Sequence, residues 1–291
     1  MGFTNNYSPL RYPGGKAAIT DFFVGLLDRT NITRNGTYCE PFAGGAGVAL
    51  TLLLTGRVSN IIINDYDKHI AAFWKTIISE PDAFIAQIQN VEISIDEWER
   101  QRYIYDNIDN FNIDIAEQRL KIGFSSFFLN RCNRAGILPK AGPIGGKKQT
   151  GKYKINARFN KEKMIERIKT IVAYKNNISI TNLDAEKFLD SLPQLTQTGC
   201  DTFLYLDPPY YKNGEKLYLN FYEHQNHLSL AQKMSRFDFC PWIMTYDDCQ
   251  EIRAMYESFS NMRISELPIQ YSMQKVRKAS EIMIFTEKMG L

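Results

Sequence analysis

The residues of this chain best suited to chemistry form the tetrapeptide Asp207-Pro208-Pro209-Tyr210. It directly follows Thr202-Phe203-Leu204-Tyr205-Leu206, an apolar run that is typical of a buried strand. The Asp207 carboxylate can accept hydrogen bonds from an amine. The prolines restrict the backbone, so the carbonyl groups around them, including that of Pro208, keep fixed directions. Tyr210 offers a flat face for stacking. The tetrapeptide therefore predicts a site for the amino group of a planar base, against the alternative of a structural Asp-Pro turn.

A second candidate site is the glycine turn Phe42-Ala43-Gly44-Gly45-Ala46-Gly47. It joins a predicted strand, residues 36–42, to an apolar helical run, residues 48–54. Glycine lets a ligand approach the backbone closely, and the helix that follows presents free N–H groups and the positive end of its dipole. A tight turn between strand and helix, with no ligand, explains the same pattern equally well.

Two acids come directly after predicted strands. Asp65 ends the run Ile61-Ile62-Ile63-Asn64, about twenty residues beyond the glycines, a spacing that suits a carboxylate bound to ribose hydroxyls. Asp184 follows residues 178–181 and suits an adenine amino group. Both positions are also typical of helix caps and turns. Lys16 follows Gly14-Gly15 and lies near the start of the first predicted helix, where a cation gains nothing from the helix dipole. Its position indicates contact with a ligand carboxylate, against the alternative of a solvated lysine.

The elements that must position these residues are strands that alternate with helices. Such alternation predicts an α/β fold with a mostly parallel sheet. The predicted strands are residues 36–42, 61–64, 178–181, 203–206, 242–246 and 281–285, and the predicted helices are 17–27, 48–54, 160–175, 228–237 and 252–259.

The polar stretch from about residue 80 to 175 predicts an insertion or second domain. Helices are expected at 97–106 and 116–129, and the Gly-, Lys- and Asn-rich segment 131–158 is expected to form exposed loops and a hairpin, with an alternating run at 152–155.

Composition bounds the class of protein. The 291 residues are 44% hydrophobic and 23% charged, so a packed core is expected in one large domain or two modest ones. No apolar run approaches the roughly 18 residues that span a bilayer, and no secretion signal is recognisable, so a cytoplasmic protein is predicted. The five cysteines are scattered and odd in number, which favours reduced thiols over a disulfide framework or zinc site, and no metal is predicted.

The charge of the chain is unevenly distributed. The net charge is only +3, yet residues 131–175 hold thirteen Lys or Arg against two acids. The remaining residues hold 22 basic and 30 acidic side chains, a net of −8. An acidic body with one basic stretch predicts a local contact with a polyanion.

Taken in order, these motifs resemble the Dam-type (D12 class) DNA adenine-N6 methyltransferases. The matching stretches are Tyr12-Pro13-Gly14-Gly15-Lys16, Glu40-Pro41-Phe42-Ala43-Gly44-Gly45, Asn64-Asp65, Phe127-Phe128-Leu129-Asn130-Arg131 and Asp207-Pro208-Pro209-Tyr210. The resemblance implies a Rossmann-like sheet that binds S-adenosylmethionine, with S-adenosylhomocysteine as product. Residues 1–80 and 176–291 would form the catalytic domain, and residues 81–175 a smaller helical domain with a hairpin that recognises the DNA target.

The resemblance also assigns roles to residues. Asp207, Pro208 and Tyr210 would be catalytic. The cofactor would contact Tyr12, Lys16, Glu40, Pro41, Phe42, Gly44, Asp65, Asp184 and Asp207. DNA would contact Arg131, Asn133, Arg134, Lys140, Lys147, Lys148 and Lys152. The expected reaction is methyl transfer to N6 of an adenine flipped out of double-stranded DNA. The resemblance implies a monomer, of bacterial or phage origin, that acts in the cytoplasm near the nucleoid. A cognate restriction endonuclease would be an optional partner, as in restriction-modification.

The chain departs from the family in three places. The family's first motif often reads Phe-x-Gly-x-Gly, whereas here glycine falls at 44, 45 and 47 with Ala46 between. Tyr12 stands where some members have Trp, and the segment Arg131–Gly136 differs from members that recognise GATC, so no target sequence is predicted. Three other functions remain open from the residues alone. They are methylation of another planar amine (cytosine N4, RNA adenine or protein glutamine), DNA binding without turnover, and a nicotinamide-dependent oxidoreductase. The last shares the fold type but does not explain the tetrapeptide.

Overall fold

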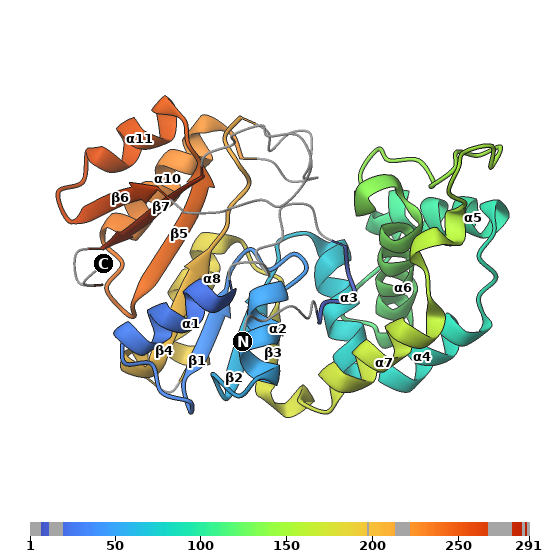
Figure 1. Cartoon of the computed structure of the whole chain (residues 1–291), viewed down its shortest axis with the longest axis horizontal. Coiled ribbons are helices and arrows are strands. Elements are labelled where there is room, and N and C mark those ends of the chain that lie inside the picture. The colour runs from blue at the N-terminus through green and yellow to red at the C-terminus, as the bar shows by residue number, and fades with distance from the viewer. Residues whose placement is uncertain are drawn as a thin grey trace.

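The computed structural model describes residues 7–11, 20–196, 198–212, 222–266, 281–286 and 289. Within these residues, one seven-stranded sheet has the order β3-β2-β1-β4-β5-β7-β6 (Figure 1). Its strands are β1 (Thr37–Glu40), β2 (Asn60–Asn64), β3 (Ile178–Thr181), β4 (Thr202–Leu206), β5 (Trp242–Asp247), β6 (Met262–Glu266) and β7 (Glu281–Thr286). The first five strands are parallel, whereas β7 is antiparallel to both β5 and β6. The predicted α/β sheet is confirmed, and β6 is an element that the sequence did not predict.

The central strands β4 and β5 are buried almost along their whole length because helices cover both faces of the sheet. Alternate residues of a strand point to opposite faces. Tyr38 and Phe203 thus pack on the same side as α1 (Thr20–Arg29) and α2 (Gly47–Leu54). Cys39 and Leu204 pack on the other side, against α8 (Ala185–Leu195), α10 (His224–Ser235) and α11 (Gln250–Glu257).

The carboxyl ends of the parallel strands meet at one edge of the sheet. The chain order reverses between β1 and β4, which are hydrogen-bonded neighbours. Open α/β sheets bind ligands outside the strand ends at such a reversal. Because β7 is antiparallel, its first residue, Glu281, lies opposite Asp247 at the end of β5 and so reaches the same edge.

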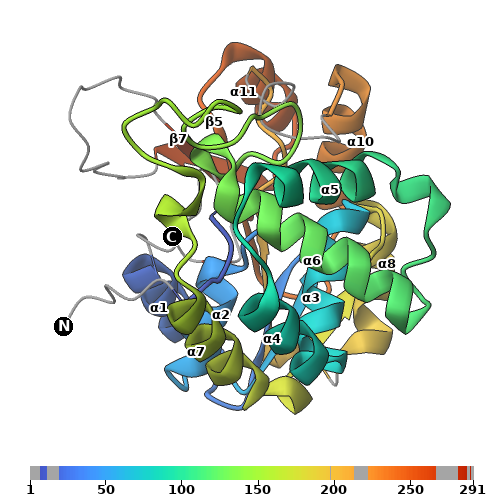
Figure 2. The ribbon, with the colours of Figure 1, turned by 90° about the vertical axis from the view of Figure 1, so that its right-hand side faces the viewer.

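Beside the sheet lies a group of helices (Figures 1 and 2). They are α3 (Lys68–Ser79), α4 (Pro81–Asn90), α5 (Ile95–Asp106), α6 (Ala116–Cys132) and α7 (Lys161–Val172). Short 3-10 turns occupy Ile108–Asn110, Arg134–Gly136, Ile155–Arg158, Lys175–Asn177 and Gly199–Asp201. The helices predicted at 97–106, 116–129 and 160–175 are confirmed within a few residues. None of the helices among the described residues is long and apolar enough to cross a membrane.

The segment between α6 and α7 differs from its prediction. The hairpin expected within residues 131–158 is not formed in this described segment, because residues 151–153 of the alternating run form a bend and a 3-10 turn begins at Ile155. Strand-like pairing in this described segment is limited to an isolated antiparallel bridge between Asn133 and Pro143.

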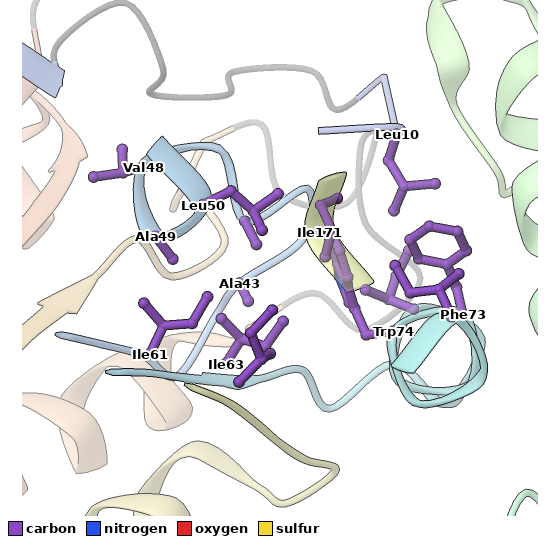
Figure 3. Close-up of a cluster of buried hydrophobic side chains, with 14 of the residues drawn as sticks. Leu10, Ala43, Val48, Ala49, Leu50, Ile61, Ile63, Phe73, Trp74 and Ile171 are labelled. Carbon is purple, nitrogen blue, oxygen red and sulfur yellow. The ribbon is translucent and has the colours of Figure 1, made fainter. Parts of the chain in front are cut away.

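One hydrophobic cluster continues from the sheet into the helical group. It includes Ile61 and Ile63 of β2, Phe73 of α3 and Ile171 of α7, which Figure 3 shows close together. The ring of Phe73 also stacks on that of Phe127 in α6, with centroids 6.0 Å apart. The boundary predicted at residue 80 falls between α3 and α4, although α3 packs directly on α6. The two parts therefore share a core.

Candidate active site at the carboxyl edge of the sheet

Asp207 is the first residue after β4, and a neighbouring strand holds its carboxylate. The hydroxyl of Thr245 in β5 donates a hydrogen bond of 2.7 Å to Asp207 Oδ1. Thr245 is only 1% exposed. Pro208 and Pro209 are buried and Tyr210 is half-buried, so the tetrapeptide emerges from the core with its two prolines fixed by packing.

The chain after the tetrapeptide is fixed by the ends of β5 and β7. Asp247 accepts hydrogen bonds from the backbone N–H groups of Tyr211 (2.9 Å) and Lys212 (3.0 Å). The Tyr210 hydroxyl donates a hydrogen bond to the Glu281 carboxylate. Burial raises the pKa of Tyr210 far above its usual value, and the nearby Asp207 and Glu281 raise it further, so the hydroxyl stays neutral. Sequence reasoning missed Thr245, Asp247 and Glu281, since no local pattern marks them.

The glycine turn leaves β1 and is held by its neighbours. Gly44 (φ 46°) and Ala46 (φ 47°) are both left-handed, so the chain reverses sharply before α2 begins at Gly47. For Ala46 this conformation is uncommon, as it is for any residue with a Cβ atom. The indole N–H of Trp74 in α3 donates to the Gly44 carbonyl at 2.8 Å. A helix of the neighbouring group thus fixes the turn.

Glu40, the last residue of β1, is a buried acid behind this turn. It is 5% exposed, and its Oε1 accepts a hydrogen bond from the Ala49 backbone N–H at 3.2 Å. Burial raises the pKa of Glu40 to about 8, although hydrogen bonding to Tyr38 and the Ala49 N–H lowers it, and the nearby Asp207 adds a smaller upward contribution. The Glu40 carboxyl group is therefore mostly protonated at neutral pH.

Asp65 links the end of β2 to the glycine turn. Its Oδ2 accepts from the Gly44 N–H (2.8 Å) and its Oδ1 from the Asp67 N–H (2.9 Å). Burial raises the pKa of Asp65 to about 7, and the nearby Asp67 raises it as well. The preceding Asn64 donates to the carbonyls of Pro41 and Leu183, each at 2.9 Å. These bonds connect the ends of β1, β2 and β3.

Asp184 is the N-terminal cap of α8, where it accepts a hydrogen bond from the Glu186 N–H at 3.0 Å. Burial raises the pKa of Tyr222, and the nearby Asp184 carboxylate raises it further. The ring of Tyr222 contacts that of Phe42 edge-on, with centroids 5.8 Å apart. Two aromatic rings and a carboxylate therefore gather beside the glycine turn. Tyr222 was not predicted from the sequence.

The structure thus brings most of the predicted cofactor residues to one edge of the sheet. Those at this edge are Glu40, Pro41, Phe42, Gly44, Asp65, Asp184 and Asp207. Tyr12 and Lys16 lie outside the described residues. Carboxylates that can accept from hydroxyl and amino groups, an aromatic pair and left-handed backbone fit a nucleoside ligand. Among the residues that the structure covers, no cluster of His, Cys, Asp and Glu could hold a metal ion.

The basic stretch supplies a second surface. Five of the seven predicted DNA contacts are exposed: Arg134, Lys140, Lys147, Lys148 and Lys152. Four of them line an open hollow of about 550 Å³, together with Ile144, Gly145, Gly146, Thr150, Gly151 and Tyr153. We call this the basic hollow. Its cations and the exposed ring of Tyr153 suit a nucleic acid backbone or base.

Close backbone crossings build the basic hollow. A Cβ atom on Gly145, whose φ is +85°, would lie 2.6 Å from the Tyr153 carbonyl oxygen, and one on Gly151 would lie 2.8 Å from Gly145 Cα. Both positions therefore require glycine. The Gln149 amide donates to the Ile144 carbonyl (2.9 Å) and accepts from the Ile155 N–H (2.9 Å), which keeps the segment folded without strands.

Arg131 and Asn133, two of the predicted DNA contacts, are both buried in this structure. The Arg131 guanidinium donates to the Arg158 carbonyl at 2.7 Å. The Asn133 side chain accepts from the Trp98 indole N–H (2.7 Å) and donates to the Ile137 carbonyl (2.8 Å). Their polar groups are used inside the protein, so the predicted DNA contacts of these two residues are not supported.

The sheet order and the site at its carboxyl edge define a doubly wound, Rossmann-like α/β fold. The chain belongs to the D12 class N6 adenine-specific DNA methyltransferase family, whose model matches residues 12–268, nearly the whole chain. It is therefore a transferase of the DNA adenine methylation class, and the family implies the use of S-adenosylmethionine.

Solved structures with a similar course of the chain include an rRNA methyltransferase, aviRa, from Streptomyces viridochromogenes. It shares 11% sequence identity with a TM-score of 0.41, over 96% of this chain and 88% of that one. A search of curated proteins finds no match.

Proposed function

We propose that this protein transfers a methyl group from S-adenosylmethionine to N6 of an adenine that has been flipped out of double-stranded DNA. The observation that carries the proposal is the position of Asp207-Pro208-Pro209-Tyr210, at the end of β4 and beside the reversal of strand order, in a chain of this family. The amine of a paired adenine lies inside the stack, so the base must leave the duplex to meet these residues.

The residues beside the glycine turn would hold the cofactor. S-adenosylmethionine supplies an electrophilic methyl group on a sulfonium sulfur. We assign Asp65 to the ribose hydroxyls, and Phe42, Tyr222 and Asp184 to the adenine ring and its amino group. Glu40, Pro41 and Gly44 shape the turn, while Tyr12 and Lys16 are assigned to the cofactor by resemblance.

The tetrapeptide would activate the target amine. The lone pair of an adenine amine is delocalised into the ring, which makes the nitrogen a poor nucleophile. Asp207 and the Pro208 carbonyl would each accept one N6–H, favouring a pyramidal nitrogen with its lone pair toward the methyl group. Tyr210 would stack on the flipped base. Asp207 would also stabilise the positive charge on N6 and accept the proton that N6 then loses.

The basic hollow and Lys140 would contact the DNA. Phosphate contacts from Lys and Arg position a protein on DNA, and a few side chains recognise bases. We assign residues 81–175 to target recognition and residues 1–80 and 176–291 to catalysis, in a protein that acts as a monomer. Asp207 and the basic stretch are far apart in sequence, and one hydrophobic core joins the two parts of the chain that carry them. This arrangement is consistent with one part that holds the duplex and another that receives the flipped base.

The decisive experiment is transfer of labelled methyl from S-adenosylmethionine to unmethylated genomic DNA, followed by nucleoside analysis. We expect N6-methyladenine with the unchanged protein and none with Asp207→Ala. Asp190→Ala, which removes a surface carboxylate paired with Lys233 on the outer helices, is the matched control and should keep full activity. Equal activity of Asp207→Ala would contradict the mechanism. Label in cytosine N4, RNA or protein, but not in DNA adenine, would contradict the substrate.

A further inference from the structure

Thr245 lies directly beside Asp207 at the carboxyl edge of the sheet. The register of β4 and β5 pairs Tyr205 with Ile243 and Leu206 with Met244. Continuing this register by one residue brings Asp207 next to Thr245, and their side chains meet at 2.7 Å. A hydroxyl that donates to a carboxylate over such a distance makes a strong, charge-assisted hydrogen bond.

The direction of this bond also fixes a second one. The Tyr205 hydroxyl lies 2.8 Å from Thr245 Oγ1, and both are buried. A threonine hydroxyl has a single hydrogen. Because Thr245 gives its hydrogen to Asp207, Tyr205 must donate to Thr245. The result is a directed chain from Tyr205 through Thr245 to Asp207, and hydrogen bonds in such a chain strengthen one another.

Tyr205 anchors the chain in the hydrophobic core. It is 3% exposed, and its ring packs edge-on against Phe23 of α1, with centroids 4.5 Å apart. By contrast, the terminal torsion of an aspartate is soft, so its carboxylate rotates readily unless a neighbour fixes it. The packed ring thus sets the position of the Thr245 hydroxyl, and the hydroxyl sets the plane of the carboxylate.

We propose that Thr245 is a positioning residue for methyl transfer, whose hydroxyl, oriented by Tyr205, sets the rotation of the Asp207 carboxylate toward the N6 amine. This rests on the proposed role of Asp207. A carboxylate in the wrong plane accepts the N6–H along a poor direction, and the amine then fails to present its lone pair in line with the methyl group. Small errors in such alignment cost large factors in rate.

Four variants separate positioning from a contribution to folding alone. Thr245→Val keeps the shape but leaves the Tyr205 hydroxyl buried without its acceptor, which should lower stability. The double variant Tyr205→Phe/Thr245→Val removes both polar groups and should regain much of that stability. Thr245→Ser restores the hydroxyl. Thr202→Val is the matched control, because Thr202 is equally buried at the opposite end of β4, where its hydroxyl donates to the Thr198 carbonyl.

The rates of methyl transfer to DNA, measured in the steady state and in single turnovers, should rank the variants in a different order from their thermal stabilities. We expect Thr245→Val and the double variant to lose about tenfold to a hundredfold in the rate of transfer, with the KM for S-adenosylmethionine and DNA unchanged. Thr245→Ser should recover most of the rate, and Thr202→Val should keep all of it. A double variant whose single-turnover rate stays within about twofold of the unchanged protein would overturn the positioning role.

The same assays keep this inference apart from the proposed function. If Asp207→Ala abolishes transfer while the double variant is fully active, the catalytic role of Asp207 stands and the role of Thr245 fails. If Asp207→Ala is itself active, the proposed function fails first. A rate that simply follows the fraction of folded protein in all the variants would assign Thr245 to folding alone.

Discussion

The carboxyl group of Glu40 is buried in an environment that disfavours its charged form. Burial at the end of β1 raises its pKa to about 8, from an ordinary value of 4.5. The folded protein therefore retains a proton that the unfolded chain has already lost over that range. The stability contributed by this proton is complete below about pH 4.5 and is lost progressively as the pH rises through about 8.

Glu40→Gln should therefore change how stability depends on pH. Each pH unit between the two pKa values lowers the free energy of unfolding by up to about 1.4 kcal/mol per group. From about pH 6 to about pH 8, the variant should gain up to about 2 kcal/mol relative to the unchanged protein. Urea unfolding at both values measures this. Glu92→Gln, at an exposed position, controls for loss of a carboxylate, and parallel stability curves for Glu40→Gln would contradict the assignment.

The place of a residue in the site could be predicted where it follows directly from the order of strands along the chain. Asp65 and Asp207 end buried strands, and the parallel sheet places both at its carboxyl edge. Thr245 and Glu281 could not be found in this way, because they reach the site through neighbours that are distant in sequence. The burial of Arg131 could not be predicted for the same reason, since its type indicates charge but not the carbonyl group that it binds.

At the scale of elements, the basic hollow between α6 and α7 provides a test of DNA binding. Replacing Lys147, Lys148 and Lys152 together by Gln should weaken DNA binding and leave S-adenosylmethionine binding unchanged. For each phosphate that the variant no longer neutralises, the slope of log affinity against log salt should become shallower by about 0.9. Lys147 also pairs with Glu99 at 3.0 Å, so its own contribution should be the smallest of the three.

The control for this test is a triple change of equal charge at Lys163, Lys169 and Lys175. All three are exposed but lie in or just after α7, away from the lining of the basic hollow. Fluorescence anisotropy with a labelled duplex at several salt concentrations measures both slopes. Equal slopes for the two triple variants would remove the basic hollow from the DNA contact and leave only a general effect of charge.

Helices and strands with a clear hydrophobic pattern and clear end signals were predicted well. Elements that depend on pairing with segments distant in sequence were not. Residues 178–181 were predicted as a strand and form β3 with those bounds. Strand β6, Met262–Glu266, was missed because it is short, mixed in polarity and paired to β7 alone. Residues 152–155 alternate in sequence, yet Gln149 and the close glycine crossings fold that stretch into turns.

At the scale of the whole molecule, the shared core predicts cooperative unfolding of the sheet and the helical group. Phe73 of α3 is fully buried and contacts Trp74, Phe84 and Phe127. Phe73→Ala should therefore destabilise both parts equally, by about 3–5 kcal/mol.

The three tryptophans allow this to be measured. Trp98 lies in α5 and Trp242 in β5, so variants that retain only one of them report on the helical group or on the sheet. We expect coincident denaturation curves for the two reporters, shifted together by Phe73→Ala. Earlier loss of the Trp98 signal would show that the helical group unfolds by itself.

The residue that hydrogen-bonds Tyr210 lies on β7 and is translated well after the tetrapeptide. Glu281 is separated from the tetrapeptide by some seventy positions, and it reaches the site only when β7 inserts between β5 and β6. Domains form from the N-terminus first during synthesis. A growing chain thus has its glycine turn and Asp207 before it has the partner of Tyr210. Insertion of β7 into the sheet is then the step at which Tyr210 gains this partner.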